Sequence, residues 1–410
     1  MKKTSKVKTH VLQNRSFAFL WTGQSISLFG IAIYTTCLPF LVFQAGGDAV
    51  ELGFAHSFFI IPQIIFLLVS GVLVDRWPRK VILIICDVIR GLAVVGITAL
   101  LLMDSLVLIH IYALTGLLGF LSTFYRPAVR GITPQIVAKN QLISANSLRS
   151  ISQQLSEMIG PVIGGALVVN VGLYAAYGIN SVTFLLSALF VSFVTVRKIQ
   201  NKEMPSEKRR NSFWKDFQDG WLVIKERAWL GVSILIGSLA NIGIASFDVI
   251  ILPVFAKDSY NGVLTYSWIL SSMAIGALIC AFIIGRDAKF TRRGILYYSF
   301  MALSGGGVLL LSFNPALWLV LLIVAMIGFS LTAFIIIWES AVQELVEEEV
   351  LGRVTSFQMF GGLALLPIGY WIFGIVIEKF GTTTSMTIAG ISIILVSILG
   401  LTNKKIRDLN

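Results

Sequence analysis

Long apolar runs recur along the whole of this chain and constrain its fold more than any other feature. The 410 residues are 56% hydrophobic and only 13% charged, about half the charged fraction of a soluble domain. Because a helix needs about 20 largely apolar residues to cross a bilayer, the runs predict an all-α integral membrane protein with twelve transmembrane helices. The predicted spans are 16–43, 51–74, 80–103, 107–127, 147–170, 173–196, 229–256, 262–285, 293–313, 316–338, 352–377 and 383–402.

The basic residues predict how the chain is oriented. Nearly all of the 32 Lys and Arg side chains fall in alternate connections, on the side of both termini; only Lys257 and Lys379 fall on the other side, and Arg90 lies within a span. Since basic connections stay in the cytoplasm, we expect a protein of the cytoplasmic membrane with both termini in the cytoplasm. The net charge of +11 then reflects topology and attraction to anionic lipid, and gives no case for a nucleic-acid partner.

One long polar segment divides the chain. Residues 197–228 predict a cytoplasmic linker with an amphipathic helix, between an N-terminal six-helix bundle at 1–196 and a C-terminal six-helix bundle at 229–410. The two halves repeat, because the glycine and arginine of Gly71–Arg79 recur in Gly285–Arg293. Parallel repeats with a site between them near the middle of the membrane are typical of secondary transporters. We therefore expect two pseudo-symmetric bundles around a cavity.

Two motifs and three longer segments carry a resemblance to a known family. The turn between the second and third spans reads GVLVDRWPRK (71–80), and the fifth span contains GPVIGG (160–165). The chain thereby resembles the major facilitator superfamily, whose signature G-x-x-x-D-R-x-G-R-[RK] the turn matches except that a proline replaces the inner glycine. The segments FYRPAVRGITPQIV (124–137), SANSLRSISQQ (144–154) and LGRVTSF (351–357) resemble its macrolide-efflux and siderophore-exporter branch. The resemblance implies export by alternating access, of the drug:proton antiporter type.

Asp75 stands where the second span meets the cytoplasm. A carboxylate there can face the N-terminus of a helix that begins in the cytoplasm, whose unpaired amides favour an anion. In the family that helix is the eleventh, which here begins near Arg353. The resemblance thus implies a latch between the halves; the alternative is that the bases only set topology. The expected latch residues are Gly71, Asp75, Arg76, Arg79, Lys80 and Arg353.

Asp87 and Arg90 lie inside the third span. Their i, i+3 spacing puts both side chains on one face of the helix, so we expect a buried ion pair. The pair either supports the latch structurally or takes part in a proton relay.

Glu157 and Asp248 are the acids that we expect to bind protons or a cation. Glu157 lies in the fifth span with no base to pair with, so burial suits it to capture and release a proton. Alternatively it hydrogen-bonds a neighbouring helix through Gln153 or Gln154. Asp248 lies in the seventh span, which lines the cavity in this superfamily, and Asn241 falls on about the same helical face.

The glycines and proline of the fifth span predict a mechanical role. Small residues let helices approach closely, so a closely packed helix can hold the interface of the halves during transport. These residues are Gly160, Pro161, Gly164 and Gly165. The cavity is expected to have apolar and aromatic walls with sparse polar groups, and its candidates are Trp21, Gln24, Tyr34, Ser122, Tyr125 and Trp338.

The sequence contains no phosphate-binding G-x-x-x-x-G-K-[ST] motif, no His/Cys metal cluster and no catalytic constellation. We therefore expect a monomer that is not an enzyme, has no cofactor or metal, and uses the proton gradient. The predicted function is export of lipophilic, amphipathic small molecules, neutral or cationic, in exchange for protons. One alternative is a dedicated exporter of a metabolite such as a siderophore or peptide antibiotic, and an anionic substrate would engage Arg90 or Arg126. A more remote alternative is a polytopic membrane protein that transports nothing.

Overall fold

The computed structural model describes residues 11–196, 225, 228–260, 262–284 and 291–407; for residues 67–69, 71, 72, 75, 228, 348, 349, 353 and 405 it describes the backbone alone. The long helices of the first half are α1 Arg15–Gln44, α2 Ala49–Arg76, α3 Arg79–Leu102, α4 Leu108–Ile136, α5 Leu142–Asn170 and α6 Leu173–Ser192. Those of the second half are α9 Ala228–Ser246, η3 Phe247–Ile251, α10 Leu252–Ser259, α11 Val263–Ile284, α12 Arg293–Leu311, α13 Leu317–Leu345, α14 Glu348–Ala364 and α15 Leu366–Thr402. Short helices are η1 Val11–Gln13, η2 Lys139–Gln141 and α16 Lys404–Arg407.

Length and hydropathy explain how these helices meet the membrane. In the described part of the chain, ten helical segments are long and apolar enough to cross it. One of them, Val350–Thr402, has 53 residues and bends at Gly381, where φ is 80°, so it is long enough to cross twice. α5 is not among the ten because Ser, Gln, Arg and Glu dilute its apolar residues, yet its 29 residues can also span. The all-α membrane fold is confirmed, and the predicted count of twelve spans stays a prediction.

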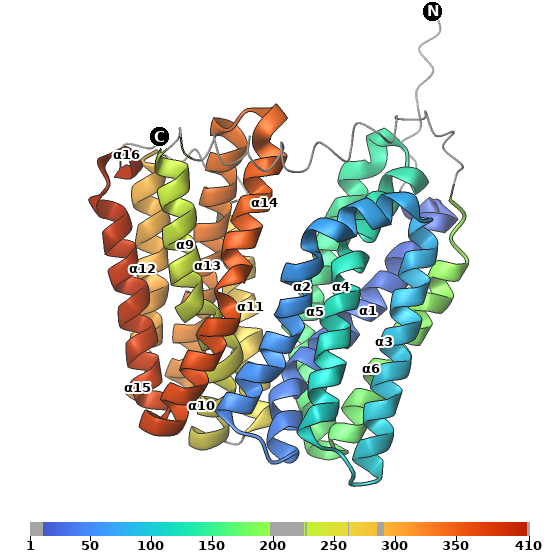
Figure 1. Cartoon of the computed structure of the whole chain (residues 1–410), viewed down its shortest axis with the longest axis horizontal. Helices are drawn as coiled ribbons and strands as arrows, with labels where there is room; N and C mark the ends of the chain where they lie inside the picture. The colour runs from blue at the N-terminus through green and yellow to red at the C-terminus, as the bar shows by residue number, and fades with distance from the viewer. Residues whose placement is uncertain (1–10, 197–224, 226–227, 261, 285–290, 408–410) are drawn as a thin grey trace, which may run out of the picture.

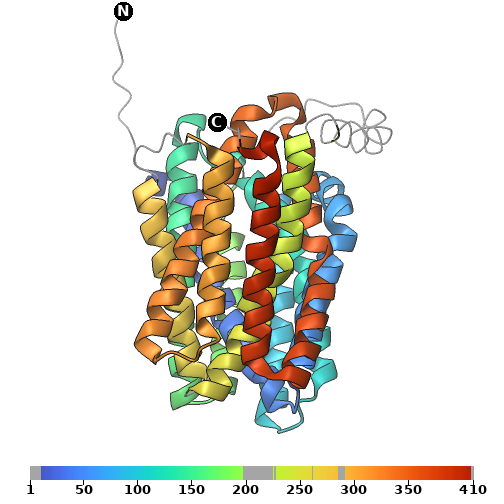
Figure 2. The same ribbon diagram turned by 90° about the vertical axis from the view of Figure 1, so that its left-hand side faces the viewer.

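The helices pack as two groups (Figure 1). In the first group α3 packs on α6, α2 on α4, and α1 on both α5 and α6. In the second, α11 packs on α13, and α12 and α9 pack on α15, as Figure 2 shows from the outer side of that group. Between the groups, α2 packs against α15 and α5 against α11. That the groups are domains at 1–196 and 229–410 stays a prediction, and most of the linker at 197–228 lies outside the described residues.

We call the face where α1 begins and α16 lies the terminal face, and the other the opposite face. α2 and α14 diverge toward the terminal face, whereas α2 and α15 come together toward the opposite face (Figure 1). The two groups are therefore held together mainly at one end.

Two helices run further than the apolar runs predicted. α4 ends at Ile136 instead of residue 127, and α13 ends at Leu345 instead of residue 338. Counting apolar residues stops at the first charges, but both helices continue as amphipathic turns, and α4 contains Pro127 and Pro134 without breaking. Arg130, which lies beyond the predicted span, therefore projects from the same helix as Arg126.

Candidate functional site

A cavity of about 380 Å³ lies between the two groups of helices. α1 and α5 line it from one side, and η3, α11 and α13 line it from the other. Glu157 and Asp248 both belong to its lining. The two acids singled out from the sequence therefore face one cavity from opposite groups, while their role in proton binding stays a prediction.

The surroundings of these two acids differ, and Glu157 is exposed, so the burial expected for it from the sequence is not found. Glu157 accepts a hydrogen bond from the Gln153 Nε2 atom one turn earlier on α5, so the expected Gln153 contact forms within the helix and not to a neighbour. Asp248 is half-buried in η3, a five-residue π-helical turn between α9 and α10, and lies close enough to Glu157 for the two charges to repel. Such π turns occur frequently at functional sites. This turn was not predicted from the sequence.

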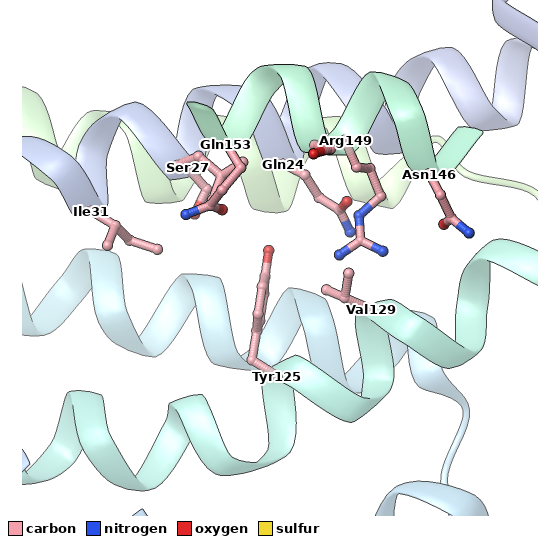
Figure 3. A pocket seen from close by; sticks show the side chains of 10 residues that line it. Gln24, Ser27, Ile31, Tyr125, Val129, Asn146, Arg149 and Gln153 are labelled. Carbon is pink, nitrogen blue, oxygen red and sulfur yellow. The ribbon is translucent and has the colours of Figure 1, made fainter. Parts of the chain in front are cut away.

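Two further cavities, of about 330 and 290 Å³, adjoin in the first group and share lining residues with the cavity between the groups. Gln153 lines all three. Figure 3 shows Tyr125 of α4 pointing toward α1 and α5, with Arg149 reaching back from α5 toward Val129. Together the three cavities form the candidate substrate region.

Asp87 and Arg90 form the buried pair that their spacing predicts, with Asp87 Oδ1 3.6 Å from Arg90 Nη1. Ser187 donates to Asp87 Oδ2 at 2.7 Å, and Arg90 Nη2 donates to Ser122 Oγ at 3.0 Å. The Arg90 guanidinium also lies over the Tyr125 ring, 4.4 Å from its centroid. The pair thus fixes the orientation of Arg90, which lines the 290 Å³ cavity; a part in proton relay stays a prediction.

The predicted cavity residues separate into those of the first group and those elsewhere. Gln24, Tyr34, Ser122 and Tyr125 line the cavities of the first group. Trp21 is half-buried, and its Nε1 donates to the Leu148 carbonyl at 3.3 Å, which ties α1 to α5.

Trp338 and Asn241 line a separate cavity of about 160 Å³ in the second group, with Tyr297 and Phe334. Asn241 donates to the Gly362 carbonyl at 2.8 Å, which links α9 to α14. Asn241 and Asp248, expected on about the same face, thus line different cavities.

Close backbone contacts join the two groups toward the opposite face. Gly53 of α2 lies against the backbone of Tyr370 on α15, where a Cβ atom would be only 2.7 Å from the Tyr370 carbonyl oxygen. His56 stands edge-on to the Tyr370 ring with centroids 5.8 Å apart, and Ser57 donates to the Pro367 carbonyl at 3.4 Å. This contact closes the region between α2 and α15.

The fifth-helix motif makes contacts to two partners. Cβ atoms on Gly160 and Gly164 would meet Ala32 and Ile33 of α1, so these glycines let α5 lie close to its own group. A Cβ on Gly165 would overlap Ser267 of α11, so this glycine lets the groups touch. Pro161 lines the cavity between them. The mechanical role proposed for this motif stays a prediction.

Acidic side chains meet at the opposite face. Asp48 caps the start of α2, where its side chain accepts a hydrogen bond from the Val50 amide at 2.9 Å. The carboxylate oxygens of Asp48, of Glu51 and of Glu378 on α15 lie within 4.8 Å of one another. This contact, too, joins the two groups.

The predicted latch is only partly described. The side chains of Gly71, Asp75 and Arg353 lie outside the described residues, and Arg76 is exposed. Arg79 Nη1 donates to the Gly131 carbonyl, and Lys80 Nζ donates to the Ser192 carbonyl at 2.6 Å. These two bonds stay within the first group. The latch between the halves stays a prediction.

Several lining residues were not predicted from the sequence, among them the polar residues Arg130, Arg149 and Gln153. Arg130 lies beyond the predicted span 107–127 and Arg149 lies at the start of the predicted span 147–170, so neither was expected in a cavity. A helical signal was present, since Ser122, Arg126 and Arg130 recur every four residues and share one face of α4.

Two groups of membrane-spanning helices around a shared cavity, in contact at one end, define a membrane transporter. A family model described as Major Facilitator Superfamily matches residues 20–363, and the chain belongs to that superfamily. The family resemblance seen in the sequence is confirmed.

Relatives of known name agree in length with this chain. Macrolide efflux protein A of Streptococcus pyogenes is 25% identical over 401 residues, 96% of this chain and 97% of that protein. Enterobactin exporter EntS of Salmonella typhimurium is 21% identical over 399 residues, 96% of this chain and 92% of that protein. The crystal structure of a bacterial homologue of the iron transporter ferroportin in an inward-facing state has a TM-score of 0.74 at 16% identity, with 95% and 98% of the two chains covered. The last likeness concerns the fold alone.

Proposed function

We propose that this protein is a secondary active exporter that moves amphipathic small molecules out of the cell in exchange for protons. The observation that carries the proposal is the cavity between the two groups, with Glu157 on one wall and Asp248 on the other. Carboxylates inside a membrane are costly, and they mark proton and substrate pathways in transporters. The two relatives named as exporters support the direction of transport.

The terminal face is the cytoplasmic face in this proposal. Support comes from the positions of the basic residues, of which only Lys257 and Lys379 fall in connections of the opposite face. The structure then corresponds to an inward-facing state, because the two groups diverge toward the terminal face and meet at the other. Transport requires that the Gly53–Tyr370 and Gly165–Ser267 contacts separate while the terminal face closes.

Glu157 and Asp248 couple the movement of protons to the movement of substrate. When both are ionised in the inward-facing cavity their charges repel, and binding of a proton to either acid removes that repulsion. Because one acid belongs to each group, occupancy of the cavity changes the force between the groups themselves. Competition between proton and substrate for this region produces exchange.

Neutralisation of both acids tests the proposal. In cells that lack other efflux systems, the Glu157→Gln, Asp248→Asn double variant should lose proton-driven efflux of a fluorescent amphipathic dye while reaching the membrane at the level of the wild type. Asp104→Asn is the matched control, since Asp104 is an exposed acid in a turn of the opposite face. Full protonophore-sensitive efflux by the double variant would reject the role of these acids. A wild type without any protonophore-sensitive efflux across a broad drug and metabolite panel would reject proton-coupled export.

A further inference from the structure

Four arginine side chains line the 290 Å³ cavity of the first group. Arg90 comes from α3, Arg126 and Arg130 from α4, and Arg149 from α5. We call this cavity the arginine pocket. Among the described residues that line it there is no Asp or Glu.

The charges of these arginines are poorly compensated. Arg90 has Asp87 behind it, but no salt bridge within the described part of the chain involves Arg126, Arg130 or Arg149. Arg126 instead lies close enough to Arg90 and Arg130 for their like charges to repel. Arg149 likewise lies close enough to Arg130 for these two charges to repel. Arg126 and Arg130 are exposed and Arg149 is half-buried, so their side chains can reach a ligand in the cavity, and charged side chains that face a cavity between membrane helices mark a pathway for a ligand of opposite sign.

The arginines form a series that leads inward from the terminal face. At a rise of 1.5 Å per residue, Arg130 and Arg149 lie about 9 and 10 Å from the helix ends at that face. Arg126 and Arg90 lie deeper, at about 15 and 16 Å. An anion that enters from the terminal face thus meets positive charge along its whole path.

The pocket also suits an apolar ligand body. Its other walls include Leu28, Ile31, Phe59, Leu118 and Phe184. The Arg90 guanidinium is held in place by Ser122, Tyr125 and Asp87, and a fixed guanidinium fork matches the two oxygens of a carboxylate.

We propose that the arginine pocket binds the carboxylate of an amphipathic organic acid, and that such acids are substrates of this protein. The inference rests on the export function proposed above and replaces its neutral or cationic substrates by anionic ones. Gln153 connects the two sites, since it lines the arginine pocket and donates to Glu157. Exit of an organic anion and entry of a proton both carry positive charge inward, so an inside-negative membrane potential drives both.

A matched pair of probes tests the binding step. 1-Pyrenebutyrate and 1-pyrenebutanol share their ring system and differ in the carboxylate, and their affinities for the full-length protein in phosphatidylcholine nanodiscs follow from fluorescence anisotropy. We expect the acid to bind at least about tenfold more tightly than the alcohol, with a preference that weakens as salt is added. The Arg126→Gln, Arg149→Gln variant should bind both probes alike, Arg126→Lys should keep part of the preference, and Lys139→Gln, an exposed base of the same face, should keep all of it. Unchanged affinity for the alcohol shows that each variant is folded.

Equal affinities for the two probes in the wild type, or an undiminished preference in the double variant, overturn the proposal. Loss of the preference in nanodiscs that contain phosphatidylglycerol also overturns the proposal, since the pocket would then hold a lipid phosphate.

A transport assay separates this inference from the proposed function. Proteoliposomes that move both probes under a proton gradient without preference retain the exporter and reject the acidic substrate. A binding preference without gradient-driven movement of either probe rejects the exporter and keeps the anion site.

Discussion

The carboxylate oxygens of Asp48 and Glu378 lie within 4.8 Å of each other across the two groups of helices at the opposite face. The interaction with the Asp48 carboxyl, followed by slight burial and the charges of Asp48 and Glu51, raises the pKa of Glu378 to about 7, and neighbouring Lys379 opposes the rise. A raised pKa means that the contact binds its proton more tightly when the groups are together. The stabilisation that this proton gives to the contact between the groups is complete below the ordinary pKa of a glutamate, about 4.5, and is lost as the pH rises through about 7.

Closure of the opposite face should therefore depend on pH. Spin labels at Asp104 and Asn314, exposed turn residues of the two groups, should report a larger fraction of short distances at pH 5 than at pH 8. Glu378→Gln should make the distribution insensitive to pH, because its amide donates to Asp48 at any pH. An identical pH response in wild type and Glu378→Gln would contradict the assignment.

Gly53→Ala should weaken the closed state of the opposite face. The added methyl would overlap the Tyr370 carbonyl, and overpacking of this kind costs about 1–3 kcal/mol. Because the contact joins the two groups, the cost falls only on the state in which they touch, and the same spin-label pair should show more separated molecules. Gly96→Ala is the control, since a Cβ there meets no atom within 4 Å. A distribution unchanged by Gly53→Ala would show that the helices adjust locally.

Asp87→Asn should destabilise the protein. Arg90 would lose its counter-charge while its side chain remains only 4% exposed, and removal of one partner of a buried pair costs about 3–5 kcal/mol. The measurement is the thermal unfolding midpoint in detergent. Glu344→Gln, which removes the more exposed Arg293–Glu344 pair, should change stability by about 1 kcal/mol or less. Equal effects of the two substitutions would mean that Arg90 finds another partner or water.

Labelling of intact cells tests the proposed orientation. A membrane-impermeant maleimide should react with Ser105→Cys, in an exposed turn of the opposite face, and should reach Lys139→Cys at the terminal face only after permeabilisation. The native thiols Cys37, Cys86 and Cys280 are buried, so background reaction should be low. The reverse pattern would invert the topology and, with it, the assignment of this state as inward-facing.

Much of the fold could be predicted because each span carries its own apolar signal. The Asp87–Arg90 pair was also predictable, since both residues sit one turn apart on one helix. Relationships between distant segments were not predictable in this way, because nothing near Gly53 in the chain indicates that Tyr370 lies against it. The arginine pocket was missed because Arg130 and Arg149 mark span ends when charges are merely counted, although the helices run past them.

The aromatic cavity of the second group, formed by Tyr297, Phe334 and Trp338, contrasts in chemistry with the arginine pocket of the first. Polarisable rings tolerate many shapes, whereas guanidinium groups select a charge. The residues of the arginine pocket precede residues 197–228 in the sequence, and those of the aromatic cavity follow them. Recombination between related genes at that junction would exchange one of these two cavities and leave the other intact.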